Sequence, residues 1–270
     1  MRRVIYNRLK ATLFGAAMAA TVAIAPASAD VLEDVKSSGQ VNIGWAEWRP
    51  LEYRETTSGE LKGVLIAFAE EIAKRLGGKA NFIQDNWQTM TMGIDSDKFH
   101  IALMGLSEAR KRVVDFSIPL YNVPYGVIVQ DSSGLKTWDE VNQSGNKISV
   151  TTGSTTDELL ALLQKSGDVK AEVVRLKDVG GALLAVTSGK ATAFATTLDA
   201  LEQITEQQKS LRLAEGTFGA TDYGIAYKKG EEALNSALND VVQAMIDDGT
   251  AEKLLTEYAV KGSIVGAATQ

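Results

Sequence analysis

The feature that most constrains the fold of this chain is the alternation of short apolar runs with longer segments of helical periodicity. Residues 41–45 and 100–104 are runs typical of strands. Residues 64–76 instead carry apolar side chains at helical spacing and stop at a Gly-Gly pair. Strands that are separated by helices favour parallel sheets covered by helices on both faces. The pattern therefore predicts an α/β protein.

The alternation occurs twice, on either side of a break rich in Ser and Gly. In the first set we also expect strands at 81–84 and 125–130 and a helix from about Trp87. The second set comprises strands at 147–151, at Val173–Val174, at 192–196 and at 223–227, and helices at 156–164, at 180–186 and from Glu231 to the turn at 247–249. Two such sets predict two α/β lobes.

The N-terminus is expected to be a targeting segment and no part of the fold. Four basic residues in the first ten precede a small-apolar stretch at 11–25, which is short for a transmembrane helix. Ala27-Ser28-Ala29 then fits a signal-peptidase pattern. We expect a signal peptide over residues 1–29 and a mature chain of 241 residues that begins at Asp30. The alternative is a retained anchor helix.

Composition disfavours several classes of partner. The chain has no cysteine, so it forms no disulfide and carries no lipid on an N-terminal Cys. Loss of the leader removes four cations and no acid, which changes the net charge from −6 to −10. The remaining basic residues are interspersed with acids, so we expect neither nucleic acid nor an anionic membrane as a partner.

Few residues are suited to catalysis. The one histidine, His100, lies in an apolar run and is expected to be a core or strand-edge residue, because no orienting partner is evident. The sequence has no nucleophile elbow, phosphate-binding loop, dinucleotide fingerprint or metal-ligand spacing. An enzyme would depend on carboxylates alone, and we expect no cofactor and no metal.

Two segments are suited to bind an anion. Residues 105–110 follow an apolar run, where open α/β sheets bind ligands, and the Arg110 guanidinium can hold a carboxylate by two parallel hydrogen bonds. Residues 152–158 open a helix whose first N–H groups are free, and Thr155 and Glu158 have capping-box spacing. Each segment alone is also explained by an ordinary turn or cap. One segment in each lobe favours a shared site.

Three tryptophans of the first lobe lie at the expected ends of strands or starts of loops: Trp45, Trp48 and Trp87. Burial in the core is the usual fate of such residues. The polar neighbours Glu47 and Arg49 favour instead a partly open wall around an organic ligand. Arg49 itself is either a second anion clamp or a solvated charge at the rim.

Several segments resemble the polar-amino-acid family of periplasmic solute-binding proteins, family 3, which are the receptors of ABC importers. The most specific is GLSEARKRVVDFSIPLY at 105–121, in which a small hydroxyl residue is followed by an Arg three positions later and then by V-D-F-S. VNIGWAEWRPLEYRETTSGELKG, EEIAKRLGGKANFIQDNWQTM, VTTGSTTDELL and the segment from YGIAYKKG to LLTEY are similar to further parts of the family pattern. The resemblance covers nearly the whole mature chain.

The resemblance implies a type II periplasmic binding protein, in which two doubly wound α/β lobes are joined by a two-strand hinge. The crossings would lie near 125–130 and 220–226. The first lobe would consist of residues 30–126 and 224–270, and the second lobe of residues 127–223.

The resemblance also implies roles for particular residues. Arg110 would bind the α-carboxylate of the ligand, assisted by Gly105, Ser107 and, from the second lobe, Thr155. Aromatic side chains would surround the rest of the ligand. The implied ligand-binding set is Trp48, Trp87, Gly105, Ser107, Arg110, Thr155 and Thr197, with Trp45, Glu47 and Arg49 as further candidates.

The chain departs from the family at Thr197, where relatives usually carry an Asp that pairs with the ligand's α-ammonium. The nearest acid, Asp199, lies two residues further on. Either Glu47 or Asp199 replaces the missing carboxylate, or the ligand has no free α-ammonium.

The function implied is that of a periplasmic substrate-binding protein. It would close over a small carboxylate-bearing solute, an amino acid or derivative, and deliver it as a monomer to the membrane permease subunits of an ABC importer without covalent chemistry. Two alternatives stay open. One is a dehydratase-type enzyme on the same scaffold, with Glu47 or Asp199 as general acid, and the other is a ligand-sensing input protein.

Overall fold

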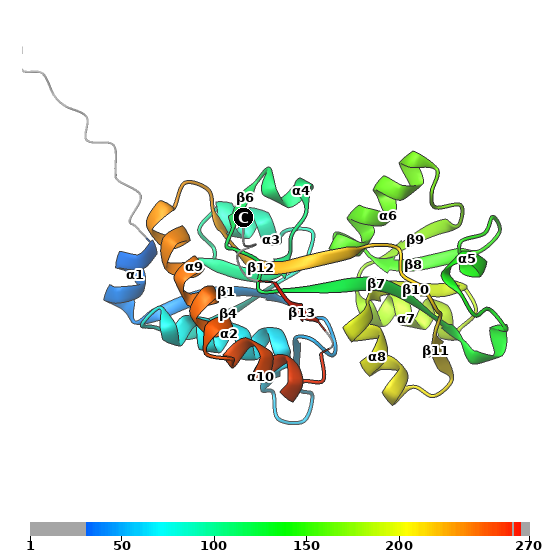
Figure 1. Ribbon diagram of the computed structural model, residues 1–270, viewed down its shortest axis with the longest axis horizontal. Helices are drawn as coiled ribbons and strands as arrows, with labels where there is room; N and C mark the ends of the chain where they lie inside the picture. Colours follow the sequence, from blue (N-terminus) through cyan, green and yellow to red (C-terminus); the bar gives the residue numbers. More distant parts are fainter. Residues whose placement is uncertain (1–30, 261, 266–270) are drawn as a thin grey trace, which may run out of the picture.

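Two α/β lobes lie side by side and are linked by two long strands (Figure 1). The computed structural model describes residues 31–260 and 262–265. The expected signal peptide and its cleavage after Ala29 lie outside these residues. Within the described part of the chain, no helix is long and apolar enough to cross a membrane.

The first lobe is built from both ends of the described chain. Its central strand β1 (Gln40–Ala46) pairs in parallel with β4 (Lys79–Asp85) and β5 (Ile101–Gly105). The other elements of this lobe are α1 (Val31–Ser38), β2 (Tyr53–Arg54), β3 (Leu61–Lys62), α2 (Val64–Arg75), α3 (Met90–Asp95), α4 (Glu108–Lys111), β6 (Val114–Phe116), α9 (Glu232–Asp247), α10 (Thr250–Glu257) and β13 (Ser263–Ile264).

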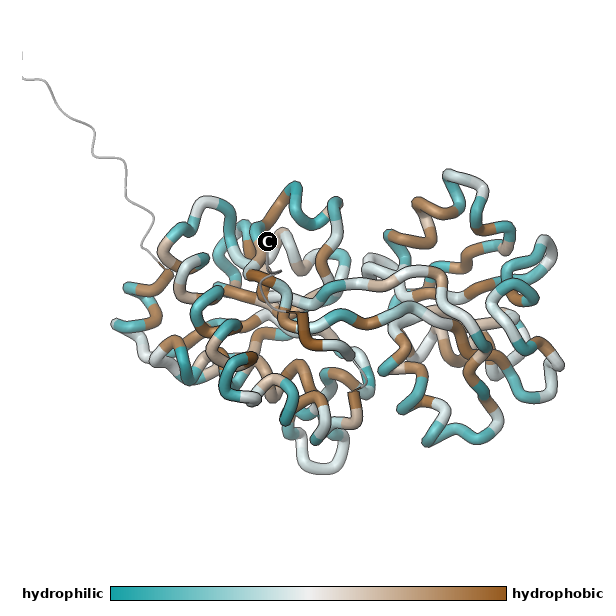
Figure 2. The backbone as a smooth tube through the Cα atoms, viewed as in Figure 1, coloured by the Kyte–Doolittle hydropathy of each residue, from teal (hydrophilic) through white to brown (hydrophobic). Residues whose placement is uncertain are grey.

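Strand β5 shows why the strands of this lobe appear in the sequence as unbroken apolar runs. Ile101 and Leu103 point into the cluster formed with α2 and α9, whereas Ala102 and Met104 point into the cluster around α3. Successive side chains of a strand face opposite sides of its sheet, and here both sides are covered. Figure 2 shows hydrophobic residues gathered inside the lobes and more hydrophilic residues on the outer turns.

The second lobe repeats this plan. Its strand β8 (Lys147–Thr151) pairs in parallel with β9 (Glu172–Leu176) and β10 (Ala193–Thr197). The remaining elements of the lobe are η1 (Asp131–Ser133), α5 (Trp138–Val141), α6 (Thr155–Ser166), α7 (Val179–Thr187), α8 (Leu198–Gln207) and β11 (Leu211–Leu213).

The strands β7 (Tyr121–Gln130) and β12 (Ala220–Lys228) connect the lobes. Residues 121–124 of β7 pair with residues 220–223 of β12, after which β7 continues beside β10 and β11, and β12 continues beside β5 and β6. The predicted architecture of two α/β lobes joined by two strands is confirmed.

Some details differ from the expectation. Both connecting strands run antiparallel to their neighbours, and each begins three or four residues before the expected strand. A strand that crosses between the lobes is long, because it pairs with a different partner in each lobe. A local hydrophobic pattern does not reveal this change of partner, so it underestimates the length of the strand. The helix expected from Trp87 begins at Met90, after a turn in which the Asn86 carbonyl accepts hydrogen bonds from the N–H groups of Thr89 and Met90.

Candidate binding site between the lobes

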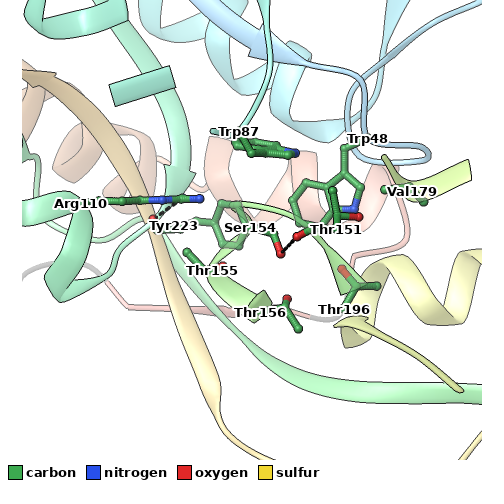
Figure 3. A pocket seen from close by; sticks show the side chains of 11 residues that line it. Trp48, Trp87, Arg110, Thr151, Ser154, Thr155, Thr156, Val179, Thr196 and Tyr223 are labelled. Atoms are coloured by element: carbon green, nitrogen blue, oxygen red, sulfur yellow. Dashed lines mark hydrogen bonds between the residues drawn. The ribbon is translucent and has the colours of Figure 1, made fainter. Parts of the chain in front are cut away.

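A small cavity lies between the two lobes and is lined by both of them (Figure 3). The lining residues from the first lobe and its connecting strand are Trp48, Trp87, Gly105, Arg110 and Tyr223. The lining residues from the second lobe are Thr151, Ser154, Thr155, Thr156, Val179 and Thr196. Five of the seven residues in the predicted ligand-binding set therefore meet here.

Arg110 reaches the cavity from the short helix α4, directly after β5. Ser107 is the N-cap of this helix, and its Oγ accepts a hydrogen bond from the Arg110 N–H at 3.2 Å. Ser107 does not line the cavity. It instead fixes the helix turn from which the guanidinium extends, since an N-cap hydroxyl satisfies one of the free N–H groups of the first turn.

The Arg110 guanidinium is buried and joins the lobes. Nη1 donates to the Gly105 carbonyl at 2.8 Å, and Nη2 donates across the cleft to the Gly153 carbonyl at 2.9 Å. Nε lies 3.3 Å from Oε1 of Glu158. Burial lowers the pKa of Arg110, the Glu158 carboxylate opposes this shift, and the group remains a cation. A guanidinium has five N–H donors, so two remain, the number that one carboxylate accepts.

Helix α6 begins one residue earlier than the capping-box spacing predicted. Ser154 is the N-cap, and its Oγ accepts a hydrogen bond from the Asp157 N–H at 3.2 Å. The predicted cap formed by Thr155 and Glu158 is therefore wrong. The shift places Thr155 in the first turn, where it faces the cavity, and leaves Glu158 to bind Arg110.

Gly105 allows the lobes to approach closely. A Cβ atom at this position would lie 2.8 Å from Thr155 Cγ2 and 2.9 Å from Thr221 Oγ1. Such distances are below ordinary van der Waals contact, so only glycine permits this backbone to lie against the start of α6.

An aromatic wall closes one side of the cavity. The rings of Trp48 and Trp87 meet edge to face at 5.7 Å, and the Arg110 guanidinium lies 5.7 Å from the Trp87 ring centroid. Trp48 also stacks with Tyr223 at 6.2 Å, and Tyr223 stacks with Tyr121 at 4.9 Å. Because Tyr121 lies on β7 and Tyr223 on β12, this stack connects the wall to both connecting strands.

Trp48 is held by a turn that contains a buried carboxyl group. The Trp48 N–H donates to the Glu52 carbonyl at 2.7 Å, and the Glu52 side chain accepts a hydrogen bond from the Ala46 N–H at 3.1 Å. Burial raises the pKa of Glu52 well above its usual range. Sequence reasoning missed Glu52, since nothing in its neighbourhood distinguishes it from the solvated acids around it.

The three further candidates do not line the cavity. Trp45 is fully buried in the first lobe. Glu47 and Arg49 lie at the rim, about half exposed and 3.8 Å apart, with the Arg49 guanidinium over the Tyr53 ring at 4.1 Å. They face a neighbouring groove that shares Val179 with the cavity.

The strand β10 presents Thr196 to the cavity and not Thr197. Thr197 is fully buried outside the lining, as expected when successive side chains of a strand alternate in direction. Asp199 is also buried outside the lining, its Oδ1 accepts a hydrogen bond from the Ala200 N–H, and burial raises its pKa to about 6. Sequence reasoning missed Thr151 and Thr196, which line the cavity from the ends of β8 and β10, and Thr156, which lines it from the first turn of α6.

His100 caps the edge of the first sheet. Its Nδ1 accepts a hydrogen bond from the Asn42 N–H at 3.2 Å, and its Nε2 lies 3.0 Å from Asp34 Oδ2. In the described part of the chain, no group of three or more His, Cys, Asp or Glu side chains could hold a metal ion.

Comparisons with known proteins identify the family. The model of the bacterial extracellular solute-binding proteins, family 3, matches residues 41–261. The chain is 27% identical to the glutamine-binding protein GlnH of Bacillus subtilis over 236 residues, which cover 85% of this chain and 84% of that protein. It is 27% identical to the L-cystine-binding protein TcyJ of Escherichia coli over 237 residues, which cover 84% of this chain and 85% of that protein.

A solved structure agrees with these relatives. An ancestral arginine-binding protein bound to arginine superposes with a TM-score of 0.73 at 26% identity, over 82% of this chain and 98% of that chain. The resemblance seen in the sequence is thus confirmed, and the chain belongs to the bacterial extracellular solute-binding proteins, family 3.

Proposed function

We propose that this protein is the substrate-binding component of an ABC importer and captures a small carboxylate-bearing solute, an amino acid or derivative, between its lobes. The observation that carries the proposal is the buried Arg110 guanidinium. It reaches a cavity lined by both lobes, bonds to both of them, and keeps two N–H donors for a ligand. The relatives named for binding glutamine and cystine support the same class of ligand.

The ligand's carboxylate binds at the meeting point of Arg110 and the start of α6. A helix N-terminus favours an anion through its free N–H groups and its dipole, and Thr155 adds a hydroxyl there. Gly105 gives the close approach and Ser107 orients Arg110 through the cap. Gly105 and Ser107 therefore help to hold the ligand-binding groups in position.

The rest of the ligand packs against the aromatic wall. Trp48, Trp87 and Tyr223 offer large apolar faces, while Val179 and the threonines close the opposite side. Apolar walls with a few placed polar groups are typical of sites for small organic ligands.

We assign residues 30–126 and 224–270 to one lobe and 127–223 to the other. The change of partner along β7, from β12 to β10 at residue 125, supports this division. Rotation about the two connecting strands opens and closes the cleft, and the ligand stabilises the closed form, which the membrane permease subunits then recognise.

We further propose that the protein acts as a monomer in the periplasm after cleavage of its signal peptide behind Ala29. The basic, apolar and Ala-x-Ala order of the first 29 residues supports the leader. The description of the family as extracellular agrees with this location.

Binding proceeds without chemical conversion of the ligand. The rival dehydratase reading needs a general acid in the cavity, and the described residues that line the cavity include no carboxylate. Of the two acids considered for this role, Glu47 lies at the exposed rim and Asp199 lies outside the lining.

Isothermal titration calorimetry of the purified mature protein against amino acids and related carboxylates tests the proposal. We expect saturable one-to-one binding, no product by mass spectrometry, and loss of binding in Arg110→Ala. Lys111→Ala is the control, since Lys111 is exposed and pairs with its helix neighbour Glu108. Product formation, or equal binding by Arg110→Ala, would contradict the proposal.

A further inference from the structure

We infer that the preferred ligand is a carboxylate whose C2 atom carries an uncharged oxygen, a 2-hydroxy or 2-oxo acid, and not an α-ammonium. This inference rests on the proposed function, because it assumes that a carboxylate binds Arg110. It concerns the group on the carbon atom next to that carboxylate.

The lining of the cavity holds one formal charge, the Arg110 cation. The other polar side chains that line it are hydroxyls, on Tyr223, Ser154 and four threonines. None of the lining residues, all of which belong to the described chain, carries a carboxylate. An ammonium placed beside the carboxylate would therefore share the cavity with a cation and would face hydroxyl groups and aromatic rings, but no carboxylate of the lining.

The carboxylates nearest to the cavity lie outside its lining. Asp178, next to the lining residue Val179, accepts a hydrogen bond from the Gly181 N–H at 2.8 Å. Asp157 accepts a hydrogen bond from the Gly153 N–H at 3.0 Å and lies 2.7 Å from Arg175 Nε. Glu158 Oε1 lies against Arg110, on the Nε side of the guanidinium, whereas its Oε2 is buried and has no hydrogen-bond partner among the described residues. At the exposed rim, Glu47 accepts a hydrogen bond from the Arg54 N–H and lies near Arg49.

Asp199 and Glu52 are buried acids that also stay outside the cavity. Asp199 and Glu52 are 1% and 3% exposed, each accepts a backbone hydrogen bond, and neither belongs to the lining. Burial raises the pKa of both groups, so each favours its neutral form more than an exposed acid does. They are poorly suited to hold a ligand cation.

An uncharged oxygen suits these surroundings better. A buried charge without a partner is strongly disfavoured, whereas a hydroxyl or carbonyl oxygen pairs with hydroxyl groups, which both donate and accept. The Thr151 hydroxyl is buried in the lining and makes no hydrogen bond to another described residue. It is free to bind a neutral polar group of the ligand.

Calorimetry with ligand pairs of identical carbon skeleton tests the inference. L-Leucine, L-phenylalanine and L-alanine are each compared with the corresponding 2-hydroxy and 2-oxo acids. For the best-fitting skeleton, we expect the hydroxy or oxo acid to bind at least about tenfold more tightly than the amino acid, which corresponds to about 1.4 kcal/mol. Equal or tighter binding of the amino acid in every pair would overturn the inference.

The outcomes separate the inference from the proposed function. If the amino acids bind more tightly and Arg110→Ala abolishes this binding, the proposed function stands and the inference alone fails. Glu158→Gln then shows whether that carboxylate receives the ammonium, since the loss of affinity would be larger for the amino acids than for the hydroxy and oxo acids. If no acid of either kind binds, both proposals fail.

A charge introduced into the lining gives a second test. Thr196→Asp places a carboxylate in the cavity, and Thr196→Asn is the matched control of equal size without the charge. We expect the Asp variant to weaken hydroxy-acid binding at least tenfold relative to the Asn variant and to strengthen amino-acid binding. Circular dichroism verifies that both variants fold. Identical ligand preference in the two variants would contradict the inference.

Discussion

Arg110 Nε and Glu158 Oε1 lie 3.3 Å apart across the cleft, one on α4 of the first lobe and the other on α6 of the second. The same guanidinium donates to carbonyl oxygens of Gly105 and Gly153, again one in each lobe. The group proposed to bind the ligand is therefore also a contact that holds the lobes together. Ligand binding and lobe closure depend on one side chain, so a variant of either partner changes both.

Arg110→Ala should abolish carboxylate binding and leave the lobes folded. Two hydrogen bonds from a charged donor are lost, each about 1.5–3 kcal/mol, so we expect affinity to fall roughly 100-fold or more. Arg110→Lys keeps the charge but not the paired donors, and it should recover only part of the affinity. Calorimetry measures the affinity and circular dichroism the fold. An unfolded Arg110→Ala protein would mean that Arg110 is required by the lobe itself.

Glu158→Gln should favour the open form of the ligand-free protein. The variant keeps the shape of the side chain but removes its charge, which weakens the interlobe contact with Arg110. Small-angle X-ray scattering should show a larger radius of gyration than for the unmodified protein. Glu108→Gln is the control, since Glu108 is exposed and pairs with Lys111 within one helix. An unchanged radius would mean that this pair does not hold the lobes.

Gly105→Ala should hinder closure of the lobes. The added methyl group would lie 2.8 Å from Thr155 Cγ2 of the second lobe and 2.9 Å from Thr221 Oγ1 of the connecting strand β12. We expect ligand affinity to fall about tenfold or more, with a smaller loss of thermal stability from the contact with Thr221. Gly180→Ala is the control, because its methyl group would meet its nearest neighbour at an ordinary 3.5 Å. Equal affinity of both variants would contradict the prediction.

The sequence predicted the two lobes because each buried strand and its covering helix leave a local pattern. The apolar run at 100–104 indicates a strand that is buried on both faces, and the periodic pattern at 64–76 indicates a helix that is buried on one face. The structure contains both elements, as β5 and α2. Arg110 could be predicted for a similar reason, as a cation among small residues at the end of a strand.

The parts that could not be predicted depend on a shift of one residue or on distant contacts. Ser154 and Thr155 are both able to cap α6, and only the fold decides that Ser154 does so. Thr196 and Thr197 are neighbours on β10 and face opposite sides of the sheet, so an error of one position in the expected strand exchanges their places. Tyr223 reaches the cavity because β12 crosses between the lobes, which no neighbouring residue in the sequence indicates.

The pH dependence of stability should reveal the buried carboxyl group of Asp199. Burial raises its pKa to about 6 in the folded protein, and the nearby Glu202 adds to the shift. In the unfolded chain an Asp titrates near 3.9. The folded protein therefore holds this proton more tightly. Its contribution to the free energy of unfolding is present below about pH 4, is lost as the pH rises to about 6, and amounts to roughly 3 kcal/mol.

Asp199→Asn should remove this dependence, because the amide keeps the shape of the side chain and does not ionise. We expect the variant to match the unmodified protein near pH 4 and to exceed its free energy of unfolding at pH 7 by up to about 3 kcal/mol. Urea unfolding at several pH values between 4 and 7 measures the difference. Asp131→Asn serves as the control, since the side chain of Asp131 is 71% exposed. If the Asp199 variant kept the slope of the unmodified protein, the carboxyl group of Asp199 would not be its source.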